Sequence, residues 1–482
     1  MHTQDQNQSC LQVSAGTYIF RTALDYNVSG SFRSLNYVLD KLVERASKLT
    51  QQQQQYCAQK SITGKRKEGC LKSRAKVGNS IALINGDNKK DRKIAVFIYR
   101  MNDRMLSYEV YNAIHSVLRV SGDWQVYYYN GNETIAQTVY LFSSASFIFG
   151  FHGAGLVNAF FCKKPSVVVF EVSYYVEQEG HIWRLNSWEY TYSKKMIVVP
   201  YALNFDAELA NKGEVMKNAK NVRVDPAHLY NMQQYVRLAL VIQAYAWRYP
   251  GLSLPPSMLN PHENIDRRGS YDNFDSRVKQ ISPEEQSDAV APSSSSPTAD
   301  DLKLAMFLYP TDTTALPHEV FEAIHTVLRA DGDWRVRYYN SSETIADAHR
   351  LFSAARFVIG FNGAGFVNAI GIMKALACKK PAVVVFEISF SIDDKEDRSR
   401  TNTSSMILMS YVVRSKRASP QSNRYTSIER ADIYNMQQYV QLALSRQQFA
   451  IRNSGRANAT HSGCKHSNLS TNTSEMITIG TA

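Results

Sequence analysis

One stretch of this sequence occurs twice, and the repetition constrains the fold more than any other feature. Residues 96–159 and 306–369 align without a gap at an offset of 210 residues, and 35 of the 64 positions are identical. A shorter block, Tyr230–Val236, recurs as Tyr434–Val440. Solenoid repeats have periods of about 20–50 residues. A period near 200 therefore predicts a duplicated domain.

Each copy alternates short apolar runs with amphipathic stretches. The strands expected in the first copy are Ile94–Tyr99, Trp124–Tyr129, Phe147–Phe151, Ser166–Val172 and Lys195–Tyr201. The expected helices are Ser107–Val120, Glu133–Ser144, Leu156–Cys162 and Pro226–Trp247. A nearly continuous apolar run such as Ser166–Val172 is typical of a strand buried on both faces of a parallel sheet. The order predicts an α/β fold with two tandem Rossmann-like parallel-sheet domains.

The composition divides the chain into five expected segments. These are an N-terminal remnant (1–90, helical and partly disordered), the first copy (91–250), a disordered linker (251–302), the second copy (303–452) and a disordered tail (453–482). The linker prediction rests on its abundance of Pro, Ser, Asp and Gln, and the tail prediction on Ser, Thr and Asn.

Composition also excludes several classes of protein. Hydrophobic residues make up 44% of the chain, which excludes a disordered protein. Six Cys without a CxxC pair indicate neither a disulfide scaffold nor a structural zinc site. No apolar stretch approaches the ~18 residues of a spanning helix, and no signal peptide is visible at Met1–Cys10. The net charge of +12 leaves nucleic-acid binding as a distant alternative, although no nucleic-acid module accompanies the basic run at residues 65–76.

A glycine loop follows the third expected strand. Gly153-Ala154-Gly155 lies between the strand Phe147–Phe151 and a helix start. Small residues allow a ligand to approach the backbone, and a helix N-terminus offers free N–H groups to an anion. Ligands bind at the carboxyl ends of strands in open sheets. A ligand loop and a simple tight turn are both compatible with this motif alone.

Two other loop motifs lack residues that they require. His152-Gly153-Ala154-Gly155 would fit the oxyanion hole of a lipase-like hydrolase, but the Gly-x-Ser-x-Gly elbow that such an enzyme needs is missing from the sequence. Residues 64–73 faintly resemble a P-loop, but Cys70 and Leu71 stand where Lys and Ser or Thr belong.

Four separated elements in order carry a family resemblance. They are Arg100 and Arg104 just after a strand, the run Leu141–Asn158 with its glycine loop, Lys164-Pro165, and Val168–Val172. Together they resemble the signature of the family-61 glycosyltransferases, which include plant xylan arabinosyl- and xylosyltransferases and animal O-linked N-acetylglucosaminyltransferases. The resemblance implies a fold like the nucleotide-binding half of a GT-B-type enzyme. It further implies a UDP-sugar donor, a glycan or protein acceptor, and residence in the Golgi or endoplasmic reticulum lumen.

The resemblance gives the charged and glycine residues a donor-binding role. Arg100 and Arg104 would clamp the diphosphate of a nucleotide sugar through charge-assisted, bidentate bonds. The backbone N–H groups around Gly153, Ala154 and Gly155 would receive the remaining phosphate oxygens. The alternative for an arginine pair is a solvated face.

Three polar residues complete the expected site. His152 is the catalytic candidate and would donate to the diphosphate leaving group, or else only cap the loop. Asn158 would bind the donor by orienting the loop, or else be a satisfied buried residue. Glu171 ends an apolar strand at the expected ligand edge and would accept the hydroxyls of a ribose, or else be a capping or surface residue.

The second copy lacks both arginines and the histidine of this set. Arg100 aligns with Pro310, Arg104 with Thr314 and His152 with Asn362, and six extra residues enter near 371–376. We expect the second copy to be a non-catalytic partner.

No metal or resident cofactor is expected, because the only DxD of the second copy, Asp331-Gly332-Asp333, has the composition of a turn. The leading function is sugar transfer from a nucleotide-diphosphate donor in the first copy. The alternative is a non-catalytic nucleotide- or sugar-binding relative. Eight Asn-x-Ser/Thr sequons give mild support to a luminal glycoprotein.

Overall fold

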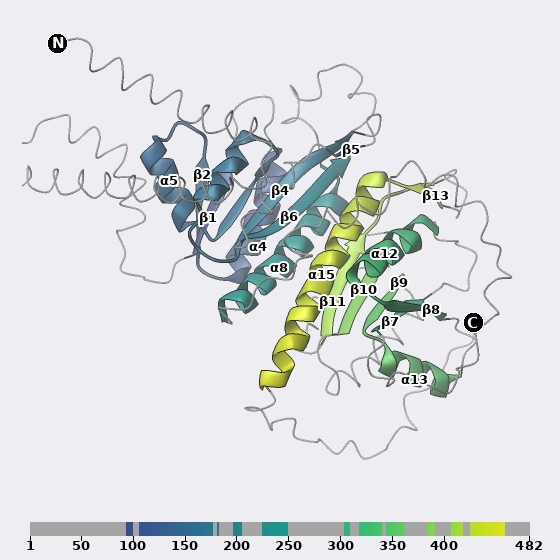
Figure 1. Ribbon diagram of the computed structural model, residues 1–482. Helices are drawn as coiled ribbons and strands as arrows, with labels where there is room; N and C mark the ends of the chain where they lie inside the picture. Colours follow the sequence, from purple (N-terminus) through teal and green to yellow (C-terminus); the bar gives the residue numbers. More distant parts are fainter. Residues whose placement is uncertain are drawn as a thin grey trace, which may run out of the picture.

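The computed structural model describes residues 93–99, 106–176, 181–182, 196–204, 224–248, 303–308, 318–339, 344–361, 383–390, 406–417 and 425–457. Two α/β units follow one another along the chain (Figure 1). The expected N-terminal remnant, the linker and nearly all of the tail lie outside the described residues. The last helix continues through Ala457, beyond the boundary expected at residue 452.

The first unit is built on a parallel sheet. Its parallel strands are β1 (Lys93–Ile98), β2 (Trp124–Tyr129), β3 (Phe147–Phe151), β4 (Val167–Val176) and β6 (Met196–Asn204). They lie in the order β2-β1-β3-β4, with β6 on the other side of β4, and the two-residue β5 (His181–Ile182) pairs antiparallel with β4. This is the doubly wound order 2-1-3-4, which confirms the predicted fold class.

Helices cover both faces of this sheet. Helix α4 (Tyr108–Ser121) buries Val110, Ile114, Val117 and Leu118 at helical spacing, and α8 (Pro226–Arg248) packs beside it. Helix α5 (Ile135–Ser144) lies over the opposite face. A capping box starts α5, because the Thr134 side chain accepts from the Gln137 backbone while the Gln137 side chain accepts from Thr134.

The second unit repeats this order. Its parallel strands are β7 (Lys303–Leu308), β8 (Trp334–Tyr339), β9 (Phe357–Phe361), β10 (Val383–Ser389) and β11 (Met406–Val412), in the order β11-β10-β9-β7-β8. Its helices are α12 (His318–Asp331), α13 (Ile345–Ala354) and α15 (Arg430–Ala457). A hairpin of β12 (Ser415–Arg417) and β13 (Tyr425–Ile428) precedes α15. Strand order and helix positions therefore match those of the first unit.

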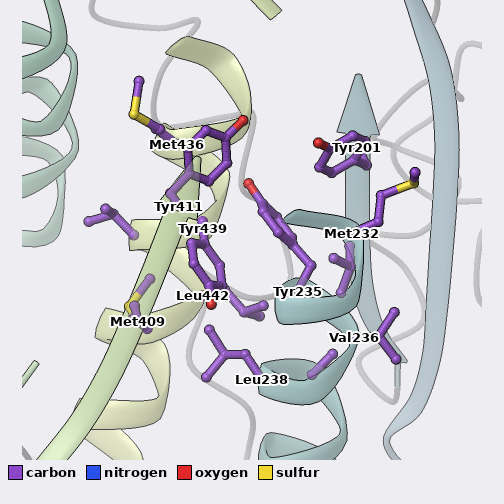
Figure 2. Close-up of a cluster of buried hydrophobic side chains, with 14 of the residues drawn as sticks. Tyr201, Met232, Tyr235, Val236, Leu238, Met409, Tyr411, Met436, Tyr439 and Leu442 are labelled. Atoms are coloured by element: carbon purple, nitrogen blue, oxygen red, sulfur yellow. The ribbon is translucent and has the colours of Figure 1, made fainter. Parts of the chain in front are cut away.

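The two units share one hydrophobic core. Helix α15 of the second copy packs against β6 of the first, and α8 of the first copy packs against β11 of the second. The two helices lie side by side between the sheets (Figure 1), and their side chains interleave (Figure 2). Both sheets therefore bury an edge strand against the other copy.

One expected helix has a different form. The segment after the glycine loop is a 3-10 helix, η1 (Ala154–Phe161), and not an α-helix over Leu156–Cys162. Its bonds join residues three apart, from Leu156 N–H to the Gly153 carbonyl at 3.0 Å and from Cys162 N–H to the Ala159 carbonyl at 2.9 Å. In the part of the chain that the structure describes, we find no helix of the length and apolarity needed to cross a membrane.

Candidate functional site

The candidate site lies where the strand order of the first sheet reverses. Strands β1 and β3 are direct neighbours, with Ile98 in register with Gly150, and the chain leaves both at the same edge. In doubly wound sheets ligands bind at the carboxyl ends of the strands at this switch point. The glycine loop follows β3 directly. Arg100 and Arg104 come a few residues after β1 and lie outside the described residues.

The glycine loop needs glycine at its turning point. Gly153 has φ +137°, a conformation that residues with a Cβ rarely adopt. The loop is anchored beside it, because the His152 backbone N–H donates to the Val172 carbonyl at 2.7 Å. Gly153 is therefore needed for the turn of the backbone. Ala154 and Gly155 follow as the first residues of η1.

A second glycine allows β3 to lie close to β1. A Cβ placed on Gly150 would stand 2.9 Å from the Cβ of Ile98, closer than real Cβ atoms come. Any larger residue would push β3 away from β1 and move the start of the loop. Gly150 thus positions the site without taking part in its chemistry.

His152 and Glu171 form a close pair. The Nδ1 atom of His152 lies 2.6 Å from Oε1 of Glu171, and the two side chains are 17% and 5% exposed. Since a carboxylate only accepts hydrogen bonds, Nδ1 carries the proton, and Nε2 is the ring atom left for other chemistry. A carboxylate on one nitrogen that orients the other is also the arrangement in Ser-His-Asp triads.

The strand register explains this pair. Glu171 stands opposite Gly150 on the neighbouring strand, and His152 lies two residues beyond Gly150. The sequence interpretation gave Glu171 a ribose contact and His152 a separate role. The structure instead brings the two side chains together. Only the alignment of β3 with β4 could have indicated the contact, because 19 residues separate the two positions.

Asn158 ties η1 to the neighbouring strand. Its Nδ2 atom donates to the Gly155 carbonyl at 3.2 Å and to the Tyr129 hydroxyl at 3.3 Å. Thr138 Oγ1 also approaches the Tyr129 hydroxyl, at 3.5 Å. Burial raises the pKa of Tyr129, which keeps its hydroxyl protonated. These contacts are compatible with both alternatives for Asn158, because an amide that ties η1 to β2 is also a satisfied residue.

The second copy keeps the carboxylate of this pair. Glu387 lies in β10 opposite Gly360, as Glu171 lies opposite Gly150, and is 3% exposed. The residue aligned with His152, Asn362, lies outside the described residues, as do Pro310, Thr314 and the six extra residues near 371–376.

The Asp331-Gly332-Asp333 segment is a turn between α12 and β8. Gly332 has φ +137°. The Asp331 carboxylate accepts from Lys303 Nζ and Trp334 Nε1 at 3.0 Å each and from Gln448 Nε2 at 2.6 Å. Its oxygens therefore hold the turn against β7 and α15. Within the described ranges no group of three or more His, Cys, Asp or Glu side chains could hold a metal ion.

Fold and loop together define a parallel α/β domain with a glycine loop at its switch point, and part of the chain matches a known family model. Residues 19–169 match the family model Glycosyltransferase 61. This part of the chain therefore carries the family-61 glycosyltransferase sequence, as the motifs predicted. The match ends inside β4, just before Glu171.

Other comparisons add little. No curated protein matches the chain. A LacI family transcriptional regulator from Arthrobacter sp. FB24, crystallised with lactose, is 9% identical over 70% of this chain and 98% of that chain, with a TM-score of 0.15. The glycotransferase of kitacinnamycin is 11% identical over 77% of this chain and 99% of that chain, with a TM-score of 0.17. Similarities this low support no statement about function.

Proposed function

We propose that the first copy transfers a sugar from a nucleotide-diphosphate donor to a hydroxyl of a glycan or protein. The observation that carries the proposal is the His152–Glu171 pair beside the glycine loop at the switch point, in the region that matches family-61 glycosyltransferases. The reaction breaks the bond between the anomeric carbon and a phosphate oxygen. It forms a bond from that carbon to the acceptor oxygen, whose proton passes to a base.

The donor would bind through its diphosphate. The start of η1 follows the carboxyl end of β3, and N–H groups at the start of a helix suit phosphate oxygens. Arg100 and Arg104 follow β1, which lies beside β3, so the chain path supports their role as the cationic clamp. UDP is the first nucleotide to test, because the family resemblance implies it.

His152 would act on the departing diphosphate. With Nδ1 bonded to Glu171, the imidazole presents Nε2 as the atom that donates a proton or hydrogen bond to the leaving phosphate. Glu171 would then be a positioning residue that fixes the orientation of the ring. The ribose contact that the sequence suggested for Glu171 stays a prediction.

A donor screen on the full chain tests the proposal. Unfolding temperatures are measured with UDP, GDP and their sugars, since a ligand at a hundred times its dissociation constant stabilises the folded state by about 2.7 kcal/mol. Transfer to candidate glycans or peptides is then assayed with the donors that bind. Binding without transfer would favour the non-catalytic relative, and no shift with any nucleotide would exclude a nucleotide-sugar site.

The arginine clamp is tested in the same assay. Arg100→Ala and Arg104→Ala should each weaken nucleotide binding by about 1.5–3 kcal/mol, the cost of a lost charged hydrogen bond. Arg119→Ala, a change at an exposed arginine of α4, is the control. Wild-type affinity in both clamp variants would remove the clamp from the site. Family-61 enzymes are typically Golgi-resident, and we propose a luminal location for this chain too.

A further inference from the structure

We propose that the second copy is a built-in partner of the first, held by a pseudo-twofold interface in which an asparagine of each copy completes the edge strand of the other. The interface would form without the linker, and its recognition would reside in the repeated block Tyr230–Val236 and Tyr434–Val440. This inference does not depend on the proposed sugar transfer.

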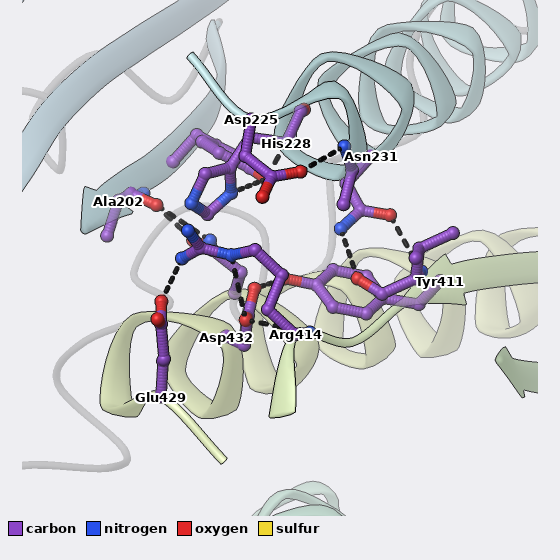
Figure 3. Close-up of polar contacts among 12 residues, drawn as sticks. Ala202, Asp225, His228, Asn231, Tyr411, Arg414, Glu429 and Asp432 are labelled. Atoms are coloured by element: carbon purple, nitrogen blue, oxygen red, sulfur yellow. Dashed lines mark hydrogen bonds and ion pairs between the residues drawn. The ribbon is translucent and has the colours of Figure 1, made fainter. Parts of the chain in front are cut away.

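The two asparagines make reciprocal contacts. Asn435 of α15 accepts from the Ala202 backbone N–H and donates to the Ala202 carbonyl, both at 2.8 Å. Asn231 of α8 accepts from the Val412 backbone N–H at 2.8 Å and donates to the Val412 carbonyl at 2.7 Å (Figure 3). Both asparagines are fully buried. A contact that occurs once in each direction defines an isologous interface.

The side-chain amides of the two asparagines bond backbone groups that a further strand would otherwise pair with. Ala202 lies in β6 and Val412 in β11, the outer parallel strands of their sheets. An edge strand leaves backbone N–H and C=O groups unpaired, and burial makes an unpaired group costly. A primary amide offers one acceptor and donors side by side, which matches the two groups of one strand residue. Each copy therefore buries its edge only while the other is docked.

Aromatic side chains close the centre of the interface. The rings of Tyr235 and Tyr439 stack with centroids 4.5 Å apart and an angle of 18° between their planes. Both belong to the repeated block and both are buried, and Figure 2 shows them facing one another from the two helices. The Tyr235 hydroxyl donates to the Asn435 carbonyl. Equivalent residues therefore meet at the pseudo-twofold axis.

Some residues of the repeated block contact the other copy, and others contact only their own copy. Its asparagines and tyrosines reach across the interface, but Gln233 donates within its own copy to the Ala113 carbonyl at 3.3 Å and to Ser116 Oγ at 3.1 Å. Gln437 likewise contacts the Ala323 carbonyl of its own copy. Gln233 therefore provides a matched control for Asn231, two residues away on the same helix.

A polar cluster makes the two copies unequal at this interface. Tyr201 Oη lies 2.8 Å from His228 Nδ1 in the first copy, and at the aligned place in the second copy the Tyr411 hydroxyl donates to Asp432 at 2.9 Å (Figure 3). Arg414 pairs with Asp432 and with Glu429.

Arg414 also links the copies electrostatically. Although burial lowers the pKa of Arg414, Asp432, Glu429 and, from the first copy, Asp225 together raise it above its ordinary value. The guanidinium of the second copy thus interacts favourably with a carboxylate of the first. The first copy has Asn204 at the position aligned with Arg414, so a pair of two first copies would lack this guanidinium.

Cutting the linker of the full chain tests the proposal. A specific protease site is placed within residues 270–290, the purified chain is cut, and native mass spectrometry and gel filtration follow the fragments on dilution. We expect one 1:1 complex of the two fragments to persist. Fragments of the wild-type chain that separate at micromolar concentration, or that form pairs of like fragments, would overturn the proposal.

The asparagine variants test the mechanism in the same cut protein. Asn231→Ala and Asn435→Ala should each weaken the fragment complex at least tenfold, and Gln233→Ala should leave its dissociation constant within twofold of wild type. Circular dichroism of each uncut variant checks that it is folded. If one asparagine variant does not fold, the other still tests the reciprocal contact, and wild-type affinity in either folded variant would refute it.

Discussion

The two copies share a sheet order but use the same strand ends differently. At the switch point the first copy has His152 on Glu171, whereas the second retains the buried Glu387 and has Asn362 in the place of the histidine. At the outer strands β6 and β11 both copies keep the asparagine that docks the other. The copies have therefore diverged at the switch point and remain equivalent at the interface between them.

The largest expected effect concerns the switch point, where the copies have diverged. His152→Ala should reduce sugar transfer by about 10²–10⁴-fold, the usual contribution of a positioned acid or base. The change also removes a partner of the buried Glu171 carboxylate, so circular dichroism checks that the variant is folded before the rates are compared. His325→Ala, a histidine of α12 in the second copy, is the control. Steady-state rates with a donor that binds give the measurement, and an unchanged rate for His152→Ala would contradict the site.

The next effect concerns the interface between the two copies. Asn435→Ala in the uncut chain leaves two buried backbone groups of Ala202 unpaired and should cost about 2–4 kcal/mol of unfolding free energy. Asn231→Ala should cost a similar amount through Val412, since the two contacts are equivalent. Denaturant titration measures both, with Gln233→Ala as the control. A clear difference between the two asparagine variants would show that the interface is not symmetric.

A smaller difference is expected between the two buried glutamates. Glu171→Gln keeps the shape but weakens the bond to His152 Nδ1, so the imidazole loses its orienting charge. We expect kcat to fall about tenfold, the scale seen for partners that orient a working histidine. Glu387→Gln, the same change at the aligned position, should leave the rate unchanged. Equal losses in both variants would mean that the carboxylate serves the sheet and not the histidine.

Much of the fold was predictable because apolar runs and helical spacing are local properties. Trp124–Tyr129 and Phe147–Phe151 form strands with the predicted bounds, and α8 starts at the predicted Pro226. The repeated block around Asn231 was visible too, but its purpose was not. Asn231 bonds a residue 181 positions away, and a sequence repeat carries no information about which copy its side chains contact.

The site was predictable in its parts but not in its arrangement. The glycine loop and His152 follow from motif and position, and Gly153 has the conformation that requires glycine. The pairing of His152 with Glu171 depends on the register of two strands, which no local pattern sets. The 3-10 form of η1 also escaped prediction, because its apolar spacing suits either kind of helix.

The smallest effect concerns two aligned positions of the interface, His228 and Asp432, which should respond to pH in opposite directions. Burial, helped by the charge of Arg414, lowers the pKa of His228 well below 6.5, so the folded chain holds this histidine neutral. The unfolded chain takes up a proton there as pH falls below about 6.5. The contribution of His228 to stability is therefore present above that pH and is lost in acid.

Asp432 has the opposite sign. Burial raises its pKa to about 7, although Arg414 and Tyr411 oppose the shift. Because the folded chain binds this proton more tightly than the unfolded chain, the contribution of Asp432 is complete below about pH 4 and is lost as pH rises through 7.

Unfolding temperatures of wild type, His228→Gln and Asp432→Asn between pH 5 and 8 separate the two groups. Relative to wild type, His228→Gln should gain stability toward pH 5 and Asp432→Asn toward pH 8. Each gain should be at least about 2–4 °C, the shift that ~1 kcal/mol produces in 150–250 ordered residues. Parallel curves for the three proteins would show that neither group titrates between folded and unfolded states, and the interface would then be unequal in shape but not in charge.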